Sequence, residues 1–394
     1  MKNVSDFNTS VIRALGILGA FCLCLLAFSG IFSGFSVCGY ANAEETEAIR
    51  LIFVCEGRKF VFEPDYSGLS EEEKSARRIY DEKGRTELID EILTLIPDSA
   101  AALEYVFCGL GNFLDKLDSR FSENPVNAFL AFGFRGDKAE ARLVGGKNGR
   151  KIDRQELYKR LIMKLKSEVY SVKVPFKTLY PAENDESVLR ESFVRGEFST
   201  YCNTANENRT HNIRLALSAL DGIKLAPGEI FSFNGIVGER CERRGYRVSK
   251  VINNGEYAEG VGGGVCQVST TLYNAALVAG LEITERHRHT LRSGYVEAGF
   301  DAMVNYGGAD LRIKNSTGGN VYILTDMNSD GRIRAVFFGM KNPCVITRES
   351  VLIADYGKGS VRTDSYLVYT ENGKVVKRVK IHGDYYYPNP SLAD

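Results

Sequence analysis

The stretch GVGGGVCQVSTTLYNAALVAG (residues 260–280) joins a glycine-rich turn to an apolar helix. Its small and apolar residues fall on one helical face: Leu272, Ala275, Ala276 and Ala279. Gly280 is a suitable C-terminal stop, because glycine readily adopts the left-handed conformation that ends many helices. The pattern therefore predicts a helix that begins between Cys266 and Ser269, directly after three glycines.

A cysteine at this position has a specific chemical setting. The positive end of the helix dipole lowers the pKa of a thiol there and favours the reactive thiolate. Glycines leave neighbouring N–H groups uncovered, so the backbone at Gly263 and Gly264 could hold a developing oxyanion. We interpret Cys266 as a candidate nucleophile, and the alternative is a buried, inert cysteine.

The segment after this helix carries two histidines and a carboxylate. His287 and His289 follow a short return of the chain, which places them to come back toward the helix start. Either could serve as general base to the thiol and as acid to a leaving group, with Asp301 orienting the ring. The residues themselves leave the choice of histidine open. A zinc site is less favoured, because no C-x-x-C motif accompanies the His-x-His pair, and we predict no metal and no cofactor.

Strands and helices surround this segment on both sides. A helix is expected from Asn208, followed by a turn at 226–229. Strands are expected in four places: 230–234, 311–315, 321–324 and 333–338. The tail is predicted to form a β-hairpin about Glu371-Asn372-Gly373. Together these patterns predict an α+β fold that is rich in strands, with the Cys266 helix inside it.

The first forty-three residues are typical of an export segment. Lys2 and Arg13 precede a run without charge from Ala14 to Ala43, which ends in small residues at alternate positions. The run is also long enough to span a bilayer, for which about 20 residues suffice. We predict that residues 1–43 are a signal peptide or a transmembrane anchor, with the rest of the chain outside the cytoplasm.

Residues 44–185 are predicted to form a small α+β module. Two strands are expected within 49–63, and helices within 70–95 and 100–117. A strand–turn–helix–strand unit follows, in which Asp153 is a candidate helix N-cap. The buried face of its helix would consist of three leucines: Leu157, Leu161 and Leu165. The polar stretch that begins at Pro181 is interpreted as a linker to a second domain, residues 186–394.

Fifty basic and fifty acidic residues leave the chain without net charge. A global electrostatic hold on nucleic acid is thereby excluded, because it needs a cationic excess. A local basic run remains: Arg240, Arg243, Arg244, Arg247 and Lys250. It is either a solvated surface or a set of guanidinium groups suited to peptide carboxylates. Six of the nine cysteines lie beyond the export segment, which is too sparse for a disulfide scaffold but allows one or two bridges.

Three separated motifs resemble one family. NRTHNIRLA (208–216), GVGGGVCQVSTTLYNAAL (260–277) and ERHRHT (285–290) occur in the order typical of the VanW domain of bacterial cell-envelope proteins. The resemblance covers roughly residues 195–340. This chain departs from the family's usual His-Pro-His-Ser at Arg288 and Thr290, while both histidines are present. The unit before it resembles the peptidoglycan-binding module that often precedes a VanW domain, although an ordinary spacer fits equally well.

The resemblance implies an activity. Some VanW domains are regarded as the catalytic part of L,D-transpeptidases, which form 3-3 cross-links in peptidoglycan with the motif's cysteine as nucleophile. The expected catalytic residues are Cys266, His289, His287 and Asp301, with His289 favoured over His287. The expected substrate-binding residues are Gly263, Gly264, Ser269, Arg209, Arg240 and Arg244. The expected partners are peptidoglycan stem peptides, and the membrane through the N-terminal segment. The alternatives are a non-catalytic envelope protein that binds peptidoglycan or a glycopeptide, and a metal-dependent hydrolase.

Overall fold

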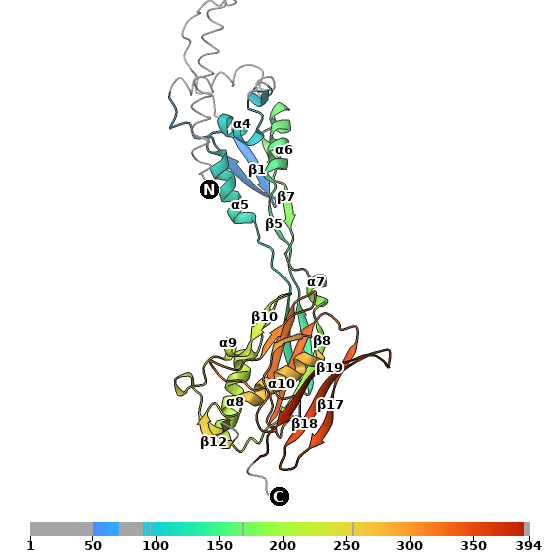
Figure 1. The fold of residues 1–394 in the computed structure, drawn as a ribbon. Coiled ribbons are helices and arrows are strands. Elements are labelled where there is room, and N and C mark those ends of the chain that lie inside the picture. The colour runs from blue at the N-terminus through green and yellow to red at the C-terminus, as the bar shows by residue number, and fades with distance from the viewer. Residues whose placement is uncertain are drawn as a thin grey trace, which may run out of the picture. The chain divides into compact units, whose positions relative to one another are not determined.

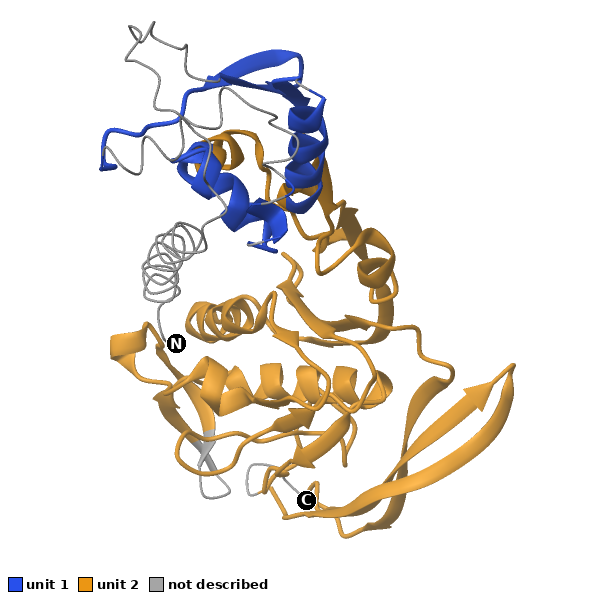
Figure 2. Cartoon of the chain, turned by 90° about the horizontal axis from the view of Figure 1, so that it is seen from above, with its two compact units in different colours: residues 1–113, 155–173 blue, residues 114–154, 174–394 orange. Residues whose placement is uncertain are grey.

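The computed structural model describes residues 50–70, 90, 92–94, 96–167, 169–253 and 256–389. The chain divides into two compact units, coloured in Figure 2: unit 1 is Met1–Phe113 with Gln155–Lys173, and unit 2 is Leu114–Arg154 with Val174–Asp394. The domain limits drawn from the sequence stay a prediction, and so does the export segment, which lies outside the described residues. Among the residues described, no helix combines the length and the apolar character needed to span a membrane.

Unit 1 contains a three-stranded sheet with helices around it. Strand β1 (Leu51–Cys55) lies between its antiparallel neighbour β2 (Arg58–Phe62) and its parallel neighbour β6 (Ser171–Lys173). The helices are α4 (Ser99–Val106), α5 (Leu110–Phe121, shared with unit 2) and α6 (Arg154–Lys166). The two strands expected within 49–63 are confirmed, and Glu56 and Gly57 in the turn between them have positive φ. The three leucines expected on one face of α6 are buried.

Four antiparallel strands form the central sheet of unit 2, in the order β8-β16-β15-β9. Their bounds are β8 (Phe193–Tyr201), β9 (Lys224–Leu225), β15 (Val321–Met327) and β16 (Arg332–Gly339). Helices α8 (Glu207–Leu220) and α10 (Val265–Val278) pack on this sheet, as Figure 1 shows. The main core of unit 2 therefore lies between the two helices and the sheet.

A hairpin from the middle of the chain covers the other face of this sheet. Alternate residues of a strand point to opposite faces. Ala335 and Phe337 of β16 accordingly belong to the main core, whereas Val336 and Phe338 pack against Ala139. Ala139 lies in the hairpin formed by β3 (Phe129–Arg135) and β4 (Lys138–Val144). The hairpin thus supplies a layer of the same fold, which the sequence did not indicate.

Shorter elements connect these layers. The hairpin β11–β12 spans β11 (Val248–Asn253) and β12 (Glu256–Val261), and a second small sheet has the order β10-β14-β13. Its strands are β10 (Ile230–Ser232), β13 (Glu282–Glu285) and β14 (Arg312–Lys314). The remaining elements are β5 (Gly149–Ile152), β7 (Phe176–Leu179), α7 (Asp185–Leu189), α9 (Phe233–Val237) and the 3-10 helix η2 (Glu242–Arg244). The strand expected over 230–234 ends early, because Ser232 caps α9 by accepting a hydrogen bond from the Gly235 N–H.

The C-terminal tail forms a sheet of three long strands, visible in Figure 1 as β17, β18 and β19. Their bounds are β17 (Val345–Asp355), β18 (Val361–Glu371) and β19 (Lys374–Tyr386). The predicted hairpin is confirmed: Asn372 and Gly373 both have positive φ, as a tight two-residue turn requires. Ile346 and Leu367 of this sheet join the main core of unit 2.

The predicted α+β class and the predicted central helix are both confirmed. Helix α10 begins at Val265, directly after Gly264, and ends just before Gly280, which has a φ of +73°. The Leu281 N–H then donates to the Ala276 carbonyl and closes the C-terminal turn. Burial differs from the one-sided expectation: α10 is buried on all sides from Gln267 to Leu277.

Candidate active site

The turn before α10 requires its glycines. Gly262 and Gly264 have φ values of +87° and +110°, which side chains rarely adopt. A Cβ atom on Gly263 would lie 2.6 Å from the Lys250 carbonyl oxygen, and one on Gly264 would lie 2.9 Å from Ile213. Both distances are far too short for carbon, so the three-glycine turn sets how closely the start of α10 packs on its neighbours.

Cys266 is the second residue of α10 and is half-buried, with its Sγ 3.4 Å from the Val304 carbonyl oxygen. The Val265 and Gln267 N–H groups donate to Gly262 and Gly264. Within the described part of the chain, the Cys266 N–H has no hydrogen-bond acceptor. The thiol therefore lies beside an unpaired amide at the positive end of a helix.

The structure brings His289 and Asp301 to this cysteine. The His289 ring lies close enough to the Cys266 thiol for each group to shift the pKa of the other. Its Nδ1 lies 2.6 Å from Asp301 Oδ2, and the same oxygen accepts the His289 backbone N–H at 2.6 Å. Since Nδ1 faces the carboxylate, Nε2 is the nitrogen left for the thiol. The three side chains thus lie in the order Cys–His–Asp that nucleophilic catalysis uses.

Asp301 is 1% exposed and has two further partners. Its Oδ1 accepts hydrogen bonds from Arg286 Nη2 at 2.9 Å and from the Tyr386 hydroxyl at 2.5 Å. The Tyr386 hydroxyl also accepts the Gly299 N–H, and Arg286 pairs with Asp384 at 2.8 Å. Asp384 and Tyr386 come from β19, so the C-terminal sheet fixes the carboxylate that orients His289.

These contacts shift all three pKa values in a consistent way. Burial raises the pKa of Cys266, but its interaction with His289 and the charges of His289 and Arg240 bring it below the ordinary thiol value. Burial lowers the pKa of His289, but the hydrogen bond to Asp301 and the interaction with Cys266 raise it to about 9. Burial also opposes ionisation of Asp301, yet its bonds to His289 and Arg286 lower its pKa to about 2. The arrangement favours a thiolate–imidazolium pair near neutral pH.

Two of the expected site residues have other roles in the structure. The His287 side chain is 45% exposed and its Nε2 lies 2.9 Å from Glu285 Oε1, so the structure does not bring it to Cys266. The Ser269 side chain is fully buried, and its hydroxyl donates to the Ala302 carbonyl at 2.6 Å. Ser269 therefore ties α10 to the segment that carries Asp301 and is closed to a substrate, contrary to the sequence-based expectation.

The arginines differ in their surroundings. Arg209 donates to Gln267 Oε1 at 2.9 Å and lies against Gly264, which fixes the start of α10. Arg240 is half-buried and close enough to Cys266 for their charges to interact. Its Nη1 donates to Asn234 and Gly238, while Nη2 is buried and has no hydrogen-bond partner among the described residues. Arg244 is exposed. Arg240 therefore has an unpaired donor in the neighbourhood of the Cys266 thiol.

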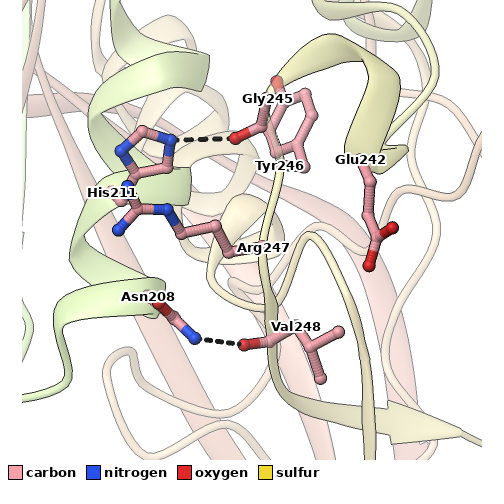
Figure 3. A pocket seen from close by; sticks show the side chains of 7 residues that line it. All are labelled: Asn208, His211, Glu242, Gly245, Tyr246, Arg247 and Val248. Atoms are coloured by element: carbon pink, nitrogen blue, oxygen red, sulfur yellow. Dashed lines mark hydrogen bonds between the residues drawn. The ribbon is translucent and has the colours of Figure 1, made fainter.

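An open pocket of about 620 Å³ lies between α8 and the segment that follows η2 (Figure 3). In Figure 3, the His211 ring bonds the Gly245 carbonyl at 2.8 Å and Asn208 donates to Val248. Glu242, Tyr246 and Arg247 complete the lining. Cys266 does not line this pocket, and Asn208 and His211 of the NRTHN motif hold the 245–248 segment there.

Asn212 also holds the 245–248 segment, from inside the fold. Its side chain is fully buried, donates to the carbonyls of Arg247 and Gly263, and accepts the Arg247 N–H. One amide therefore links α8, the 245–248 segment and the glycine turn. The amide nitrogen and the amide oxygen of Asn212 are therefore both hydrogen-bonded in this buried position.

Sequence reasoning missed three residues around the catalytic candidates: Arg286, Tyr295 and Tyr386. Arg286 is part of the ERHRHT motif, and a buried partner for Asp301 could have been sought there. Tyr386 is the middle residue of Tyr385-Tyr386-Tyr387, where strand alternation indicates one inward ring, but nothing local indicates which carboxylate it meets. Tyr295 interacts with Thr270 and with the charge of Cys266 from a loop.

The six cysteines beyond the export segment are all unpaired in the structure. The one or two bridges that the sequence allows are therefore not formed among them. Within the described ranges, no group of three or more His, Cys, Asp or Glu side chains is arranged to hold a metal ion.

Fold and geometry together define an α+β protein with a Cys–His–Asp series at the start of a buried helix. The family described as "VanW like protein" matches residues 208–337. The chain is 31% identical over 214 residues to vancomycin B-type resistance protein VanW of Enterococcus faecalis. The alignment covers 48% of this chain and 73% of that protein. The chain belongs to this VanW-like family, as its motifs predict.

A second relative extends the likeness. The chain is 38% identical over 205 residues to uncharacterized protein YoaR of Bacillus subtilis (strain 168). That alignment covers 52% of this chain and 65% of YoaR, which is just under two thirds of the relative's length. No solved structure matches the chain.

Proposed function

We propose that this protein is a cysteine-dependent L,D-transpeptidase that forms 3-3 cross-links between peptidoglycan stem peptides. The observation that carries the proposal is the arrangement of three side chains: His289 is hydrogen-bonded to Asp301 and lowers the pKa of the Cys266 thiol, which lies at a helix N-terminus. Membership of the VanW-like family supports it. The substrate lies outside the cytoplasm, which agrees with the export segment expected at residues 1–43.

The first step forms a thioacyl-enzyme. The Cys266 thiolate attacks the carbonyl carbon between the third residue of a donor stem and its terminal D-residue. The carbon–nitrogen bond breaks, and protonated His289 gives its proton to the departing amine, so a D-amino acid leaves. Asp301 keeps the ring oriented and stabilises its positive charge, as the carboxylate does in other triads.

The second step transfers the acyl group. The side-chain amine of an acceptor stem attacks the thioester carbonyl while His289 accepts a proton from it. The carbon–sulfur bond breaks, an amide bond forms, and the thiolate–imidazolium pair is restored. No oxidant, reductant or additional reagent is needed.

Two groups are suited to the charge that develops on the carbonyl oxygen. The Cys266 N–H has no acceptor among the described residues and belongs to the nucleophile itself. Arg240 supplies a buried and unpaired Nη2 close to the thiol. Donors that are fixed before the reaction stabilise an oxyanion without reorganising. Arg240 therefore serves the oxyanion or a stem carboxylate.

The test is mass spectrometry of muropeptides incubated with purified protein. Wild-type protein is expected to yield 3-3 cross-linked dimers and a free D-amino acid, and the Cys266→Ala variant neither. A Cys344→Ala variant is the matched control, because Cys344 is also a free thiol but bonds Glu371 on the C-terminal sheet. Cross-linking by Cys266→Ala at the wild-type rate would refute the mechanism. An inert wild type that still binds muropeptides would indicate a binding protein instead.

A further inference from the structure

Three exposed tyrosines of the C-terminal sheet form a continuous aromatic surface. Tyr356, Tyr385 and Tyr387 are 62%, 37% and 50% exposed. The Tyr385 ring lies edge-to-face with both neighbours, at centroid distances of 5.9 Å to Tyr356 and 5.1 Å to Tyr387. We call these three residues the tyrosine surface. Clustered exposed rings with polar edges mark binding surfaces more often than scattered ones do.

The tyrosine surface is held in place by backbone contacts. Tyr356 begins the turn between β17 and β18, where its N–H donates to the Ser360 carbonyl. The Ser360 hydroxyl donates to the Tyr386 carbonyl at 3.0 Å. Both ends of the tyrosine surface are thereby fastened to one another before any ligand binds, which lowers the entropic cost of binding.

The same residues connect the tyrosine surface to the candidate active site. The Tyr387 N–H donates to the carbonyl of Thr290, the residue after His289. Arg288, the residue before His289, lies 5.7 Å over the Tyr387 ring and donates to the His289 carbonyl. Tyr386 points inward to Asp301, while its two neighbours face solvent. One strand therefore builds both the support of the catalytic carboxylate and the tyrosine surface.

We propose that the tyrosine surface binds the glycan strand to which the peptidoglycan stems are attached. The proposal rests on the proposed function, because a stem at Cys266 brings its own sugar chain to this side of the protein. A pyranose ring offers an apolar face of C–H groups that stacks on an aromatic ring, and hydroxyl and acetamido groups that bond the phenol oxygens. Three adjoining rings fit successive sugars of a linear strand.

The composition of the surface favours a sugar over a lipid. Its rings are all tyrosines, so each apolar face ends in a hydroxyl that can bond a sugar hydroxyl. A membrane-binding surface draws its affinity mainly from buried apolar area, to which these hydroxyls contribute nothing. A peptide would instead be expected to use the unpaired strand edges, where main-chain groups supply the affinity.

The test measures binding of a stem-free glycan by calorimetry, with the hexamer of β-1,4-linked N-acetylglucosamine as probe. Wild-type protein is expected to bind it, and a Tyr356→Ala/Tyr387→Ala double variant to bind at least tenfold more weakly. Tyr180→Ala is the matched control, since Tyr180 is exposed in unit 2 outside the tyrosine surface, and it should leave binding unchanged. Equal binding by the double variant, or none by the wild type, would overturn the proposal.

Two further readings separate this proposal from the proposed function. Alkylation of Cys266 at the wild-type rate in the double variant shows that the site is intact. A double variant that loses affinity for sugar-free stem peptides but not for the hexamer would assign the surface to peptide and reject the glycan. If wild-type protein binds the hexamer yet forms no cross-links, the transpeptidase proposal fails while the glycan surface stands.

Discussion

At the scale of single residues, the chemistry of the site depends on which of its side chains are protonated. Asp301 accepts hydrogen bonds from His289, Arg286 and Tyr386, so it stays ionised in a position that is almost closed to water. An ionised carboxylate keeps His289 protonated, and a protonated His289 in turn stabilises the thiolate of Cys266. The three groups therefore behave as one titrating unit rather than as independent acids.

The first prediction concerns the reactivity of Cys266. Because His289 lowers its pKa, its alkylation by iodoacetamide should reach its plateau at a lower pH than the alkylation of an ordinary thiol. Cys344 offers an internal contrast, since its hydrogen bond to Glu371 raises its pKa. We expect Cys266 to react about tenfold faster than Cys344 at pH 6.5, measured by peptide mass spectrometry.

Two histidine variants serve as controls for this prediction. His289→Gln removes the ring that favours the thiolate, so the Cys266 profile should move to higher pH. His287→Gln removes a ring that faces Glu285, so the profile should stay in place. A Cys266 profile as steep as that of Cys344, or equal shifts in both variants, would contradict the assignment of His289.

At the scale of elements, the glycine turn and α10 deliver the cysteine. Helix α10 is buried on all sides except near its ends, so it is held by packing, and its first turn is located by the three glycines. Arg209 and Asn212 of α8 tie that turn to a neighbouring helix through Gln267 and Gly263. The position of Cys266 is therefore a property of two helices and the turn between their starts.

The second prediction tests the close approach at Gly264. A Gly264→Ala change forces a side chain into a φ of +110° and places its Cβ 2.9 Å from Ile213. We expect a loss of about 1–3 kcal/mol in the free energy of unfolding and slower alkylation of Cys266, because the helix start must shift. Denaturant unfolding and the alkylation rate measure the two effects.

The control for this change separates backbone strain from crowding. Gly222→Ala also puts a side chain at positive φ, but no atom lies within 4 Å of the new Cβ. It should cost less stability and leave the alkylation of Cys266 as it is in the wild type. If both variants lose the same stability and keep the same alkylation rate, close packing at Gly264 has no part in placing the thiol.

The bounds of α10 and the position of Cys266 at its start followed from the sequence because they depend on local signals. The glycines, the apolar helix face and the Gly280 stop lie within twenty residues of one another. The hairpin at Asn372-Gly373 was predictable for the same reason. Ser269 was misjudged because burial depends on the segment at Ala302, and the covering of the central sheet by β3–β4 joins segments about 190 residues apart.

At the scale of the whole molecule, the site extends beyond the family's matched region. That region ends at residue 337, whereas Asp384 and Tyr386 hold Arg286 and Asp301 from the last strand. The C-terminal sheet is thus part of the site's support as well as of the core. Distant segments of unit 2 meet at the buried carboxylate of Asp301. A change at this carboxylate is therefore expected to alter both the free energy of unfolding and the reactivity of Cys266.

The last prediction concerns Tyr386→Phe, which removes one donor to Asp301 and leaves the buried Gly299 N–H unpaired. The lowered pKa of Asp301, about 2, adds stability that is present above about pH 4 and lost as the pH falls through 2. Without the hydroxyl that pKa rises, so the loss begins at higher pH. We expect unfolding free energies about 1–3 kcal/mol below wild type at pH 7, a gap that narrows toward pH 2, and a shifted Cys266 alkylation profile. Tyr366→Phe is the control, because it removes a hydroxyl from β18 that does not bond Asp301. If the stability difference between Tyr386→Phe and wild type stays constant with pH, and the Cys266 alkylation profile does not shift, then Tyr386 acts only through packing.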